Sequence, residues 1–296
     1  MNVILRLGLA LLLVGMCTGV SGAQTTDENQ TRPEEPASRT VLTFGVVPQQ
    51  AASKLARLWA PLLQRVSVLT GYQLEFRTAP DIPSFEQRLA AGEYDLAYMN
   101  PYHYTVFQQN PGYTAFGREK NKQIQGILVV RQDSSLQSID DLAGTSVAFP
   151  APAAFAASIL PRAYLRQQGI AITPVYVSSH DSVYLNVARG FYPAGGGVLR
   201  TLAGIKPELR QQLRILWTTP AYTPHALAAH PRVPKSIRDV VAEAFVALQE
   251  DPQGQPLLQA LGFKNGLMLA RDADWDDIRA LQLELLDAST GLPKAE

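Results

Sequence analysis

Short apolar runs alternate along the chain with longer segments whose apolar residues recur at helical spacing. Leu55, Trp59 and Leu62, for example, share one face of a helix that follows the first apolar run. The runs that predict strands occupy residues 41–47, 72–78, 94–99, 124–131, 145–149, 173–177, 213–218 and 226–229. Strands that alternate with helices predict an α/β protein with mainly parallel sheets flanked by helices. Two such sets of elements predict two lobes with a ligand cleft between them.

The third apolar run breaks at Asn100 and a following proline, which predicts a helix with Asn100 as its N-cap. A strand that leads directly into a helix leaves unpaired N–H groups at the carboxyl edge of a sheet, where open α/β folds bind ligands. Tyr98, Asn100 and Tyr102 are therefore candidate ligand contacts, with His103 beside them. The alternative is that these aromatic side chains only pack in the core.

Two further strand-to-helix junctions would face the same cleft. Gln49 and Gln50 follow the first strand and supply amide groups. Ala153, Ala154 and Phe155 open a helix and offer only backbone N–H groups, which suit an anion. In the other interpretation, the two alanines merely allow close packing.

A fourth junction lies at Ser179 and His180, with Tyr184 one turn further on the same helix face as His180. A serine at this point is expected to cap the helix, and His180 either contacts a ligand or lies on the surface. The adjacent residues Ser179, His180 and Asp181 point in different directions and cannot form a catalytic triad.

Three features allow more than one interpretation or depend on spacing alone. Residues 195–197, all glycine, would let a ligand approach the backbone or would form a flexible turn. Arg200 is either an anion partner or a solvated surface residue. Ser84 and Gln87 have the spacing of a capping box for a short helix.

The composition excludes several classes of function. The 296 residues are 46% hydrophobic, enough for a large core, and the formal net charge is zero, which gives no electrostatic basis for nucleic-acid binding. The four histidines lack the short spacing of metal ligands, so neither a metal site nor a cofactor is predicted. The sequence contains no common catalytic motif, and this pattern indicates a binding protein rather than an enzyme.

Residues 1–23 have the features of an export signal. A positive charge precedes an apolar stretch too short to span a bilayer, and small residues up to Ala23 provide a cleavage site. Cys17, the only cysteine, allows an alternative, which is lipid attachment at a sequence that loosely resembles a lipobox. Residues 24–39 are polar and lack periodicity, which predicts a disordered linker. The protein is therefore expected in the periplasm.

Three stretches together resemble a known family. They are Phe44-Gly-Val-Val-Pro48, Tyr94-Asp-Leu-Ala-Tyr-Met-Asn-Pro-Tyr102 and residues 149–162. They resemble the phosphate, phosphite and phosphonate-binding proteins of bacterial ABC importers, which have the type II periplasmic binding protein fold. The resemblance implies a solute-binding component that captures a small anion, acts as a monomer and delivers the anion to a membrane permease.

The family's architecture implies the boundaries of two lobes. Lobe 1 would comprise residues 40–130 and 220–296, and lobe 2 residues 131–219. The lobes would close over the ligand by a hinge near residue 130 and residues 218–223. An extracytoplasmic sensor that uses the same fold, with a membrane sensor as partner, is the alternative function.

The resemblance also implies ligand contacts at Tyr98, at the turn 100–102, at the helix start 153–155 and at His180. Two departures bear on the ligand. The family has serine or threonine at the helix start where this chain has Ala-Ala-Phe, and residues 195–197 are glycine where an acidic residue would bind an amino group. An aminoalkylphosphonate is therefore not expected, while a smaller phosphorus oxyanion or a non-phosphorus ligand remains open.

Overall fold

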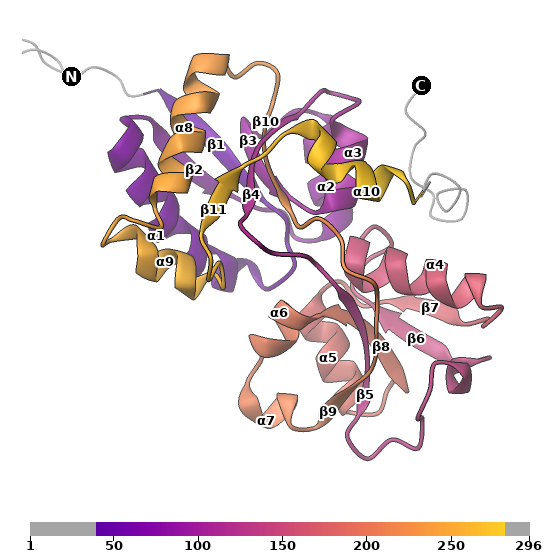
Figure 1. The fold of residues 1–296 in the computed structure, drawn as a ribbon. Helices are drawn as coiled ribbons and strands as arrows, with labels where there is room; N and C mark the ends of the chain where they lie inside the picture. Colours follow the sequence, from indigo (N-terminus) through magenta and orange to yellow (C-terminus); the bar gives the residue numbers. More distant parts are fainter. Residues whose placement is uncertain (1–39, 282–296) are drawn as a thin grey trace, which may run out of the picture. The chain divides into compact units, whose positions relative to one another are not determined.

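The computed structural model describes residues 40–281, which form two β-sheets flanked by helices (Figure 1). This arrangement confirms the predicted α/β class with two sheets. The export signal, the linker and Cys17 lie outside the described residues. Within residues 40–281, no helix has the length and apolar character needed to cross a membrane.

The first sheet has six strands in the order β11-β4-β10-β3-β1-β2. These are β1 (Val41–Val46), β2 (Gln73–Arg77), β3 (Leu96–Met99), β4 (Thr114–Glu119), β10 (Ala226–Ala229) and β11 (Leu267–Leu269). Its helices are α1 (Ala52–Thr70), α2 (Ile82–Ala90), α3 (Pro101–Phe107), α8 (Lys235–Ala247), α9 (Gly254–Ala260) and α10 (Asp276–Arg279). Figure 1 shows α1, α8 and α9 on one side of this sheet and α2, α3 and α10 on the other. The ring of Phe44 on β1 packs 5.6 Å from that of Trp59 and 5.7 Å from that of Phe245, so the strand joins α1 to α8.

The second sheet has five strands in the order β7-β6-β8-β5-β9. These are β5 (Gly126–Arg131), β6 (Ser146–Phe149), β7 (Thr173–Tyr176), β8 (Ala194–Val198) and β9 (Leu213–Thr218). Its helices are α4 (Leu160–Gln167), which continues a π-helical turn (Phe155–Ile159), α5 (His180–Ala188), α6 (Leu199–Ala203) and α7 (Pro207–Arg210). Alternate side chains of β5 enter different cores: Ile127 and Val129 pack with α5, and Leu128 and Val130 with α4.

Both sheets are mixed rather than mainly parallel, which corrects one part of the prediction. Parallel pairing is limited to β2-β1-β3 in the first sheet and β7-β6-β8 in the second. The strands that carry the chain between the sheets are β4 and β5 on the way out and β9 and β10 on the way back. Because the two passages run in opposite directions, β10 pairs antiparallel with β4, and β9 with β5.

The two passages between the sheets lie side by side. Ile124 and Tyr222 form an antiparallel bridge, in which each backbone N–H donates to the other's carbonyl oxygen, at 2.8 and 3.0 Å. Since β5 already belongs to the second sheet from Gly126 onward, the first passage lies before that residue. This is a few residues earlier than the hinge expected near residue 130.

The cap of α2 differs from the prediction. The carboxylate Oδ1 of Asp81 accepts a hydrogen bond from the backbone N–H of Ser84 at 2.8 Å, so Asp81 is the N-cap and the helix begins at Ile82. The proposed capping box at Ser84 and Gln87 is therefore wrong. Pro83, which follows Ile82, fits the first turn because a proline needs no hydrogen-bond acceptor there.

Asp81→Ala is expected to lower the free energy of unfolding by about 1 kcal/mol, because the Ser84 N–H loses its partner. Ser84→Ala is the matched control and should change it by less than about 0.5 kcal/mol. Urea denaturation of both variants measures the difference. Equal losses would contradict the assignment of Asp81 as the cap.

Candidate functional site

A small cavity lies where residues attached to the first sheet meet residues attached to the second. Its polar lining consists of Gln49, Asn100, His180 and His225, and residues 154–157 form another part of its wall. Its volume is about 10 Å³, close to the space that one water molecule needs. A larger ligand therefore requires the walls to move apart.

Asn100 connects the two sides of this cavity. It caps α3, as predicted: its Oδ1 accepts from the backbone N–H of His103 at 2.7 Å. Its Nδ2 donates to the carbonyl oxygen of Ala153 at 3.1 Å and lies 3.1 Å from Nε2 of His103. The amide thus joins the end of β3 to the segment before the π-helical turn.

His225 lies opposite, directly before β10. Its ring stacks on Tyr98, with ring centroids 4.9 Å apart and planes at 16°, and its Nε2 lies 2.8 Å from the Gln49 amide nitrogen. Burial, together with the positive charge of Arg200, lowers the pKa of His225 well below its usual range. The imidazole is therefore neutral, and its Nε2 accepts a hydrogen bond from the Gln49 amide.

Arg200 of α6 extends to the first sheet. Its guanidinium donates to the Tyr98 hydroxyl at 2.9 Å, lies 3.4 Å from a carboxylate oxygen of Glu119 and 5.5 Å from the ring centre of Phe263. Only 7% of the Glu119 side chain is exposed. Burial raises the pKa of Glu119, and the charge of Arg200 opposes this shift. The Arg200 side chain is thus partly exposed, at 28%, and the buried carboxylate of Glu119 supplies its counter-ion.

His180 is the first residue of α5 and is 1% exposed. Its Nδ1 lies 3.2 Å from the hydroxyl of Thr201, and its Nε2 is buried without a hydrogen-bond partner. Burial, and secondly the charge of Arg200, lowers the pKa of His180 to about 3. The imidazole that lines the cavity is therefore neutral at physiological pH.

The three consecutive glycines do not form a flexible turn, so that interpretation is wrong, and none of them lines the cavity. They lie buried in β8, and a Cβ at Gly196 would be 1.9 Å from the carbonyl oxygen of Ala157. A Cβ at Gly197 would be 2.2 Å from the Tyr184 hydroxyl. Gly126 on β5 meets the carbonyl oxygen of Ala156 in the same way, at 1.8 Å. The glycines therefore let the π-helical turn and α5 pack directly on the sheet.

The structure brings five of the predicted contacts together. Gln49, Asn100, Ala154, Phe155 and His180 all line the cavity, and they come from elements of both sheets. The strand-to-helix junctions that the sequence singled out thus meet at one place.

Tyr184 is not part of this lining. Its hydroxyl lies 2.7 Å from that of Thr201 and accepts from the backbone N–H of Val198 at 3.1 Å. Tyr184 is also 0% exposed and packs with Val183 and Val187 in the core under α5. Tyr184 therefore does not line the cavity in this structure, although it lies one helical turn from His180, which does.

The other predicted contacts lie behind or beside the cavity. Tyr98 supports His225, and Ala153 accepts from Asn100. Ser179 caps α5, with its Oγ accepting from the N–H of Ser182 at 3.1 Å.

Two predicted contacts remain to be placed. Gln50 is half-buried next to the end of α6, and its amide nitrogen would be 3.4 Å from a Cβ at Gly204. Tyr102 is buried in the first turn of α3. Neither residue lines the cavity.

Sequence reasoning missed His225 and the Arg200–Glu119 ion pair. His225 immediately precedes β10, which runs antiparallel to β3, so the start of β10 lies at the same sheet edge as the end of β3. That signal exists only once the strand direction is known. Glu119 and Arg200 are 81 residues apart in the chain, and nothing local indicates that they pair.

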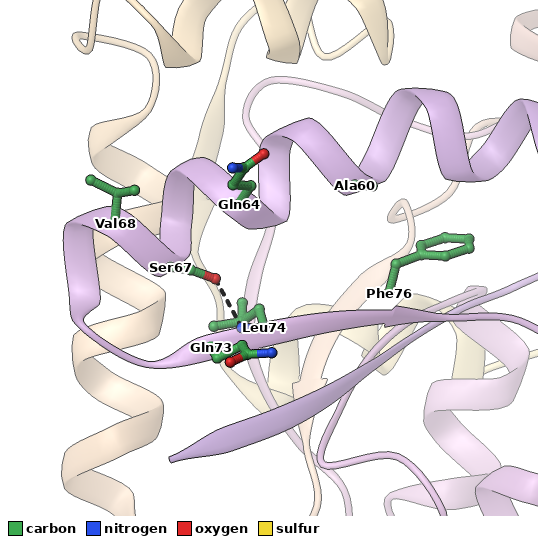
Figure 2. A pocket seen from close by; sticks show the side chains of 7 residues that line it. All are labelled: Ala60, Gln64, Ser67, Val68, Gln73, Leu74 and Phe76. Atoms are coloured by element: carbon green, nitrogen blue, oxygen red, sulfur yellow. Dashed lines mark hydrogen bonds between the residues drawn. The ribbon is translucent and has the colours of Figure 1, made fainter. Parts of the chain in front are cut away.

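A larger hollow, with a volume of about 280 Å³, lies between α1 and β2, away from this site (Figure 2). Gln64, Ser67 and Val68 of α1 and Leu74 and Phe76 of β2 contribute to its wall. The hydroxyl of Ser67 accepts from the backbone N–H of Leu74 at 2.8 Å. Its lining comes from a single helix and strand and includes no buried polar atom without a partner. It lacks the convergent polar groups of the cavity between the sheets.

In the described part of the chain, no three histidine, cysteine or acidic side chains are grouped as a metal site would require.

Comparison of the sequence with known proteins identifies its relatives. A family model described as the periplasmic substrate-binding protein of phosphonate ABC transporters matches residues 44–275. The phosphate-import protein PhnD of Mycolicibacterium smegmatis is 24% identical over 309 aligned residues, which cover 90% of this chain and 91% of that protein.

Solved structures share the fold. A binding protein component of an ABC phosphonate transporter from Pseudomonas aeruginosa has a TM-score of 0.76 at 19% identity, over 85% of this chain and 88% of that one. PhnD1 from Prochlorococcus marinus, in complex with methylphosphonate, has a TM-score of 0.75 at 15% identity, over 83% of this chain and 98% of that one. Since the family model matches well over half of the chain, the protein belongs to the periplasmic substrate-binding proteins of phosphonate ABC transporters.

Proposed function

We propose that the protein captures a small phosphorus oxyanion, such as a phosphonate, phosphite or phosphate, in the cavity between the two sheets and presents it to the permease of an ABC importer. Members of its family are exported substrate-binding components of transporters rather than enzymes. The names of two relatives, one a phosphate-import protein and one bound to methylphosphonate, support this ligand class. The observation that carries the proposal is a small cavity to which both sheets contribute, with four polar side chains in its lining, one of which has a histidine nitrogen without a partner.

The ligand enters by opening and closing of the two lobes. Asn100 and Ala153, Arg200 and Tyr98, and Lys54 and the carbonyl oxygen of Gly204 (2.7 Å) make contacts between the elements of the two sheets. These contacts close the structure around a space of about one water molecule. The hinge lies in the paired passages on either side of the bridge between Ile124 and Tyr222.

Neutral hydrogen-bonding groups, rather than a net positive charge, recognise the anion. The described residues that line the cavity include no lysine, arginine, aspartate or glutamate. Its side-chain donors are the amide of Gln49 and that of Asn100, whose Nδ2 also donates to Ala153 across the cavity. The backbone N–H groups at the first turn of the helix after Ala154 have no partner within the helix. The absence of a carboxylate from this described lining disfavours an aminoalkylphosphonate.

Asn100→Asp is expected to weaken methylphosphonate binding at least about a hundredfold. The new carboxylate keeps the cap of α3, because it still accepts from the His103 N–H, but it repels an anion and can no longer donate to Ala153. Isothermal titration calorimetry measures the change in affinity. Gln64→Glu makes the same amide-to-carboxylate change in the outer hollow of Figure 2 and should leave the affinity unchanged. Equal effects of the two substitutions would contradict the location of the site.

Thermal unfolding of the purified protein tests the ligand class directly. Phosphate, phosphite, methylphosphonate, aminoethylphosphonate and sulfate are compared, each at increasing concentration. A ligand at about a hundred times its Kd adds about 2.7 kcal/mol to the free energy of unfolding. A phosphorus oxyanion should raise the Tm. No shift with any of these compounds in a folded sample would contradict the proposed function.

A further inference from the structure

We propose that His180 presents an unprotonated Nε2 to the cavity and thereby selects the singly protonated form of a phosphonate. This form is a monoanion that still carries one P–O–H group. This inference rests on the proposed function and specifies which protonation state of the oxyanion binds. It comes from the hydrogen-bond network behind His180, which fixes the tautomer of the imidazole.

Three oxygen atoms behind His180 form a triangle. The hydroxyl oxygens of Tyr184 and Thr201 are 2.7 Å apart, and the carbonyl oxygen of Val198 lies 3.2 Å from the first and 3.1 Å from the second. The backbone N–H of Val198 donates to the Tyr184 oxygen at 3.1 Å. Outside the triangle, the Thr201 oxygen lies 3.2 Å from Nδ1 of His180.

Only two hydroxyl hydrogens are available for the three sides of this triangle. Oxygen atoms this close repel each other unless a hydrogen lies between them. If both hydroxyl hydrogens point along sides of the triangle, only one of the three oxygen–oxygen contacts lacks a hydrogen. If Thr201 donated to His180 instead, two of these contacts would lack one. The first arrangement is therefore the stable one, and in it Thr201 accepts from His180.

The proton of the imidazole is consequently on Nδ1. Burial and Arg200 keep His180 neutral, and a neutral imidazole has a single N–H, so its Nε2 is an acceptor. The other titratable or charged groups around His180 are Asp181 and Tyr184 on its own helix, Arg200 on α6 and His225 across the cavity. None of them forms a hydrogen bond with Nε2, which is left for the ligand.

A buried acceptor nitrogen discriminates between oxyanions. It receives a hydrogen bond from the O–H group of a monoprotonated phosphonate, whereas the lone pairs of a fully deprotonated oxyanion repel it. The charge of Arg200 is already compensated by Glu119, and the described lining is neutral. Both features favour a ligand with one negative charge over a ligand with two. An ammonium group is also a donor, but the described lining offers no carboxylate to compensate its charge.

Methylphosphonate and methanesulfonate provide a matched pair of probes. At a pH where methylphosphonate is a monoanion, the two have the same charge and nearly the same shape, and only methylphosphonate carries an O–H. Calorimetry on the full chain is expected to show at least about a hundredfold tighter binding of methylphosphonate, since a site built to bind a hydroxyl group strongly rejects an analogue without it. Methanesulfonate binding within about threefold of methylphosphonate would overturn the inference.

Thr201 is a positioning residue in this account, and its substitution has a direct readout. Nitrogen-15 NMR of the ligand-free protein should show the Nδ1–H tautomer of His180 in the wild type and in Thr201→Ser, which keeps the hydroxyl. In Thr201→Val the tautomer is no longer fixed, and the preference for methylphosphonate over methanesulfonate should fall to about tenfold or less. An Nε2–H tautomer in the wild type would overturn the inference, whatever ligand binds.

Failure of the proposed function has a different signature. In that case phosphate, phosphite and methylphosphonate all fail to bind to the folded protein, and the ligand selection is overturned with it. Binding of phosphate or methylphosphonate together with equally tight binding of methanesulfonate leaves the proposed function standing and overturns only the role of His180.

Discussion

Gly196→Ala is expected to lower the free energy of unfolding by about 3 kcal/mol or more and to abolish ligand binding. The new Cβ would lie 1.9 Å from the carbonyl oxygen of Ala157 and 2.6 Å from the ring of Phe149. The carbonyl group belongs to the backbone of the π-helical turn, so the clash cannot be relieved by rotating a side chain. The whole turn must move away from β8.

The loss of binding follows from the same displacement, because residues 154–157 of this segment line the cavity. Urea denaturation gives the change in stability, and calorimetry with methylphosphonate gives the change in affinity. Failure of Gly196→Ala to yield folded protein agrees with the expectation, since the clash then exceeds the stability of the fold.

Gly204→Ala is the matched control for this prediction. A Cβ at Gly204 would have its nearest neighbours at 3.4 Å, the flexible ends of the Gln50 and Lys54 side chains. Its backbone has a negative φ of −90°, which alanine adopts without strain. The control should therefore stay within about 0.5 kcal/mol of the wild type. A Gly196→Ala protein as stable as this control would show that the π-helical turn does not lie on β8 as described.

Features that depend on neighbouring residues were predictable from the sequence. Both faces of the strand Gly126–Arg131 are covered, so the residues that point to either face are apolar. They form a continuous apolar run that is easily recognised in the sequence. The N-cap at Asn100 is equally local, because the amide and the N–H that it binds are three residues apart. These local signals located the four junctions, and five residues from them meet at the cavity.

Features that depend on packing between distant segments were not predictable. Whether a glycine forms a turn, contacts a ligand or allows another backbone to approach depends on which segment packs against it. The segment that packs on Gly196 contains Ala157, which is far away in the chain. The direction of β10 decides that His225 lies beside Tyr98, and strand direction leaves no trace in hydrophobic spacing. Even the cap of α2 was missed, because Asp81 and Ser84 are both good capping residues and only the backbone geometry selects Asp81.

Arg200→Met is expected to weaken methylphosphonate binding at least about a hundredfold at neutral pH. The substitution keeps an apolar stem against Phe263 but leaves the buried carboxylate of Glu119 without its partner. Only Glu119 is buried in this pair, since 28% of the Arg200 side chain is exposed, so loss of Arg200 costs up to about 3–5 kcal/mol. Because Arg200 comes from α6 and Glu119 from β4, this cost falls on the closed arrangement of the two lobes, which is the one that holds the ligand.

The effect of Arg200→Met should grow as the pH rises. Burial already raises the pKa of Glu119, and loss of the opposing charge of Arg200 raises it further. A carboxyl group with a raised pKa stabilises the structure only where it is protonated, and this contribution is lost as the pH rises through its pKa in the folded state. The ratio of variant to wild-type Kd, measured by calorimetry, should therefore be smaller at about pH 5 than at about pH 8.

A second substitution shows whether Arg200 acts through Glu119 or on the ligand itself. If Arg200 serves to neutralise Glu119, the double variant Arg200→Met with Glu119→Gln recovers most of the lost affinity, because no buried charge is left unpaired. Arg65→Met, which breaks an ion pair with Asp251 away from the cavity, should leave the affinity unchanged. A double variant that binds as poorly as Arg200→Met would mean that the guanidinium binds the anion directly. The site would then be cationic, and a doubly charged oxyanion, rather than the protonated one that His180 favours, would be its natural ligand.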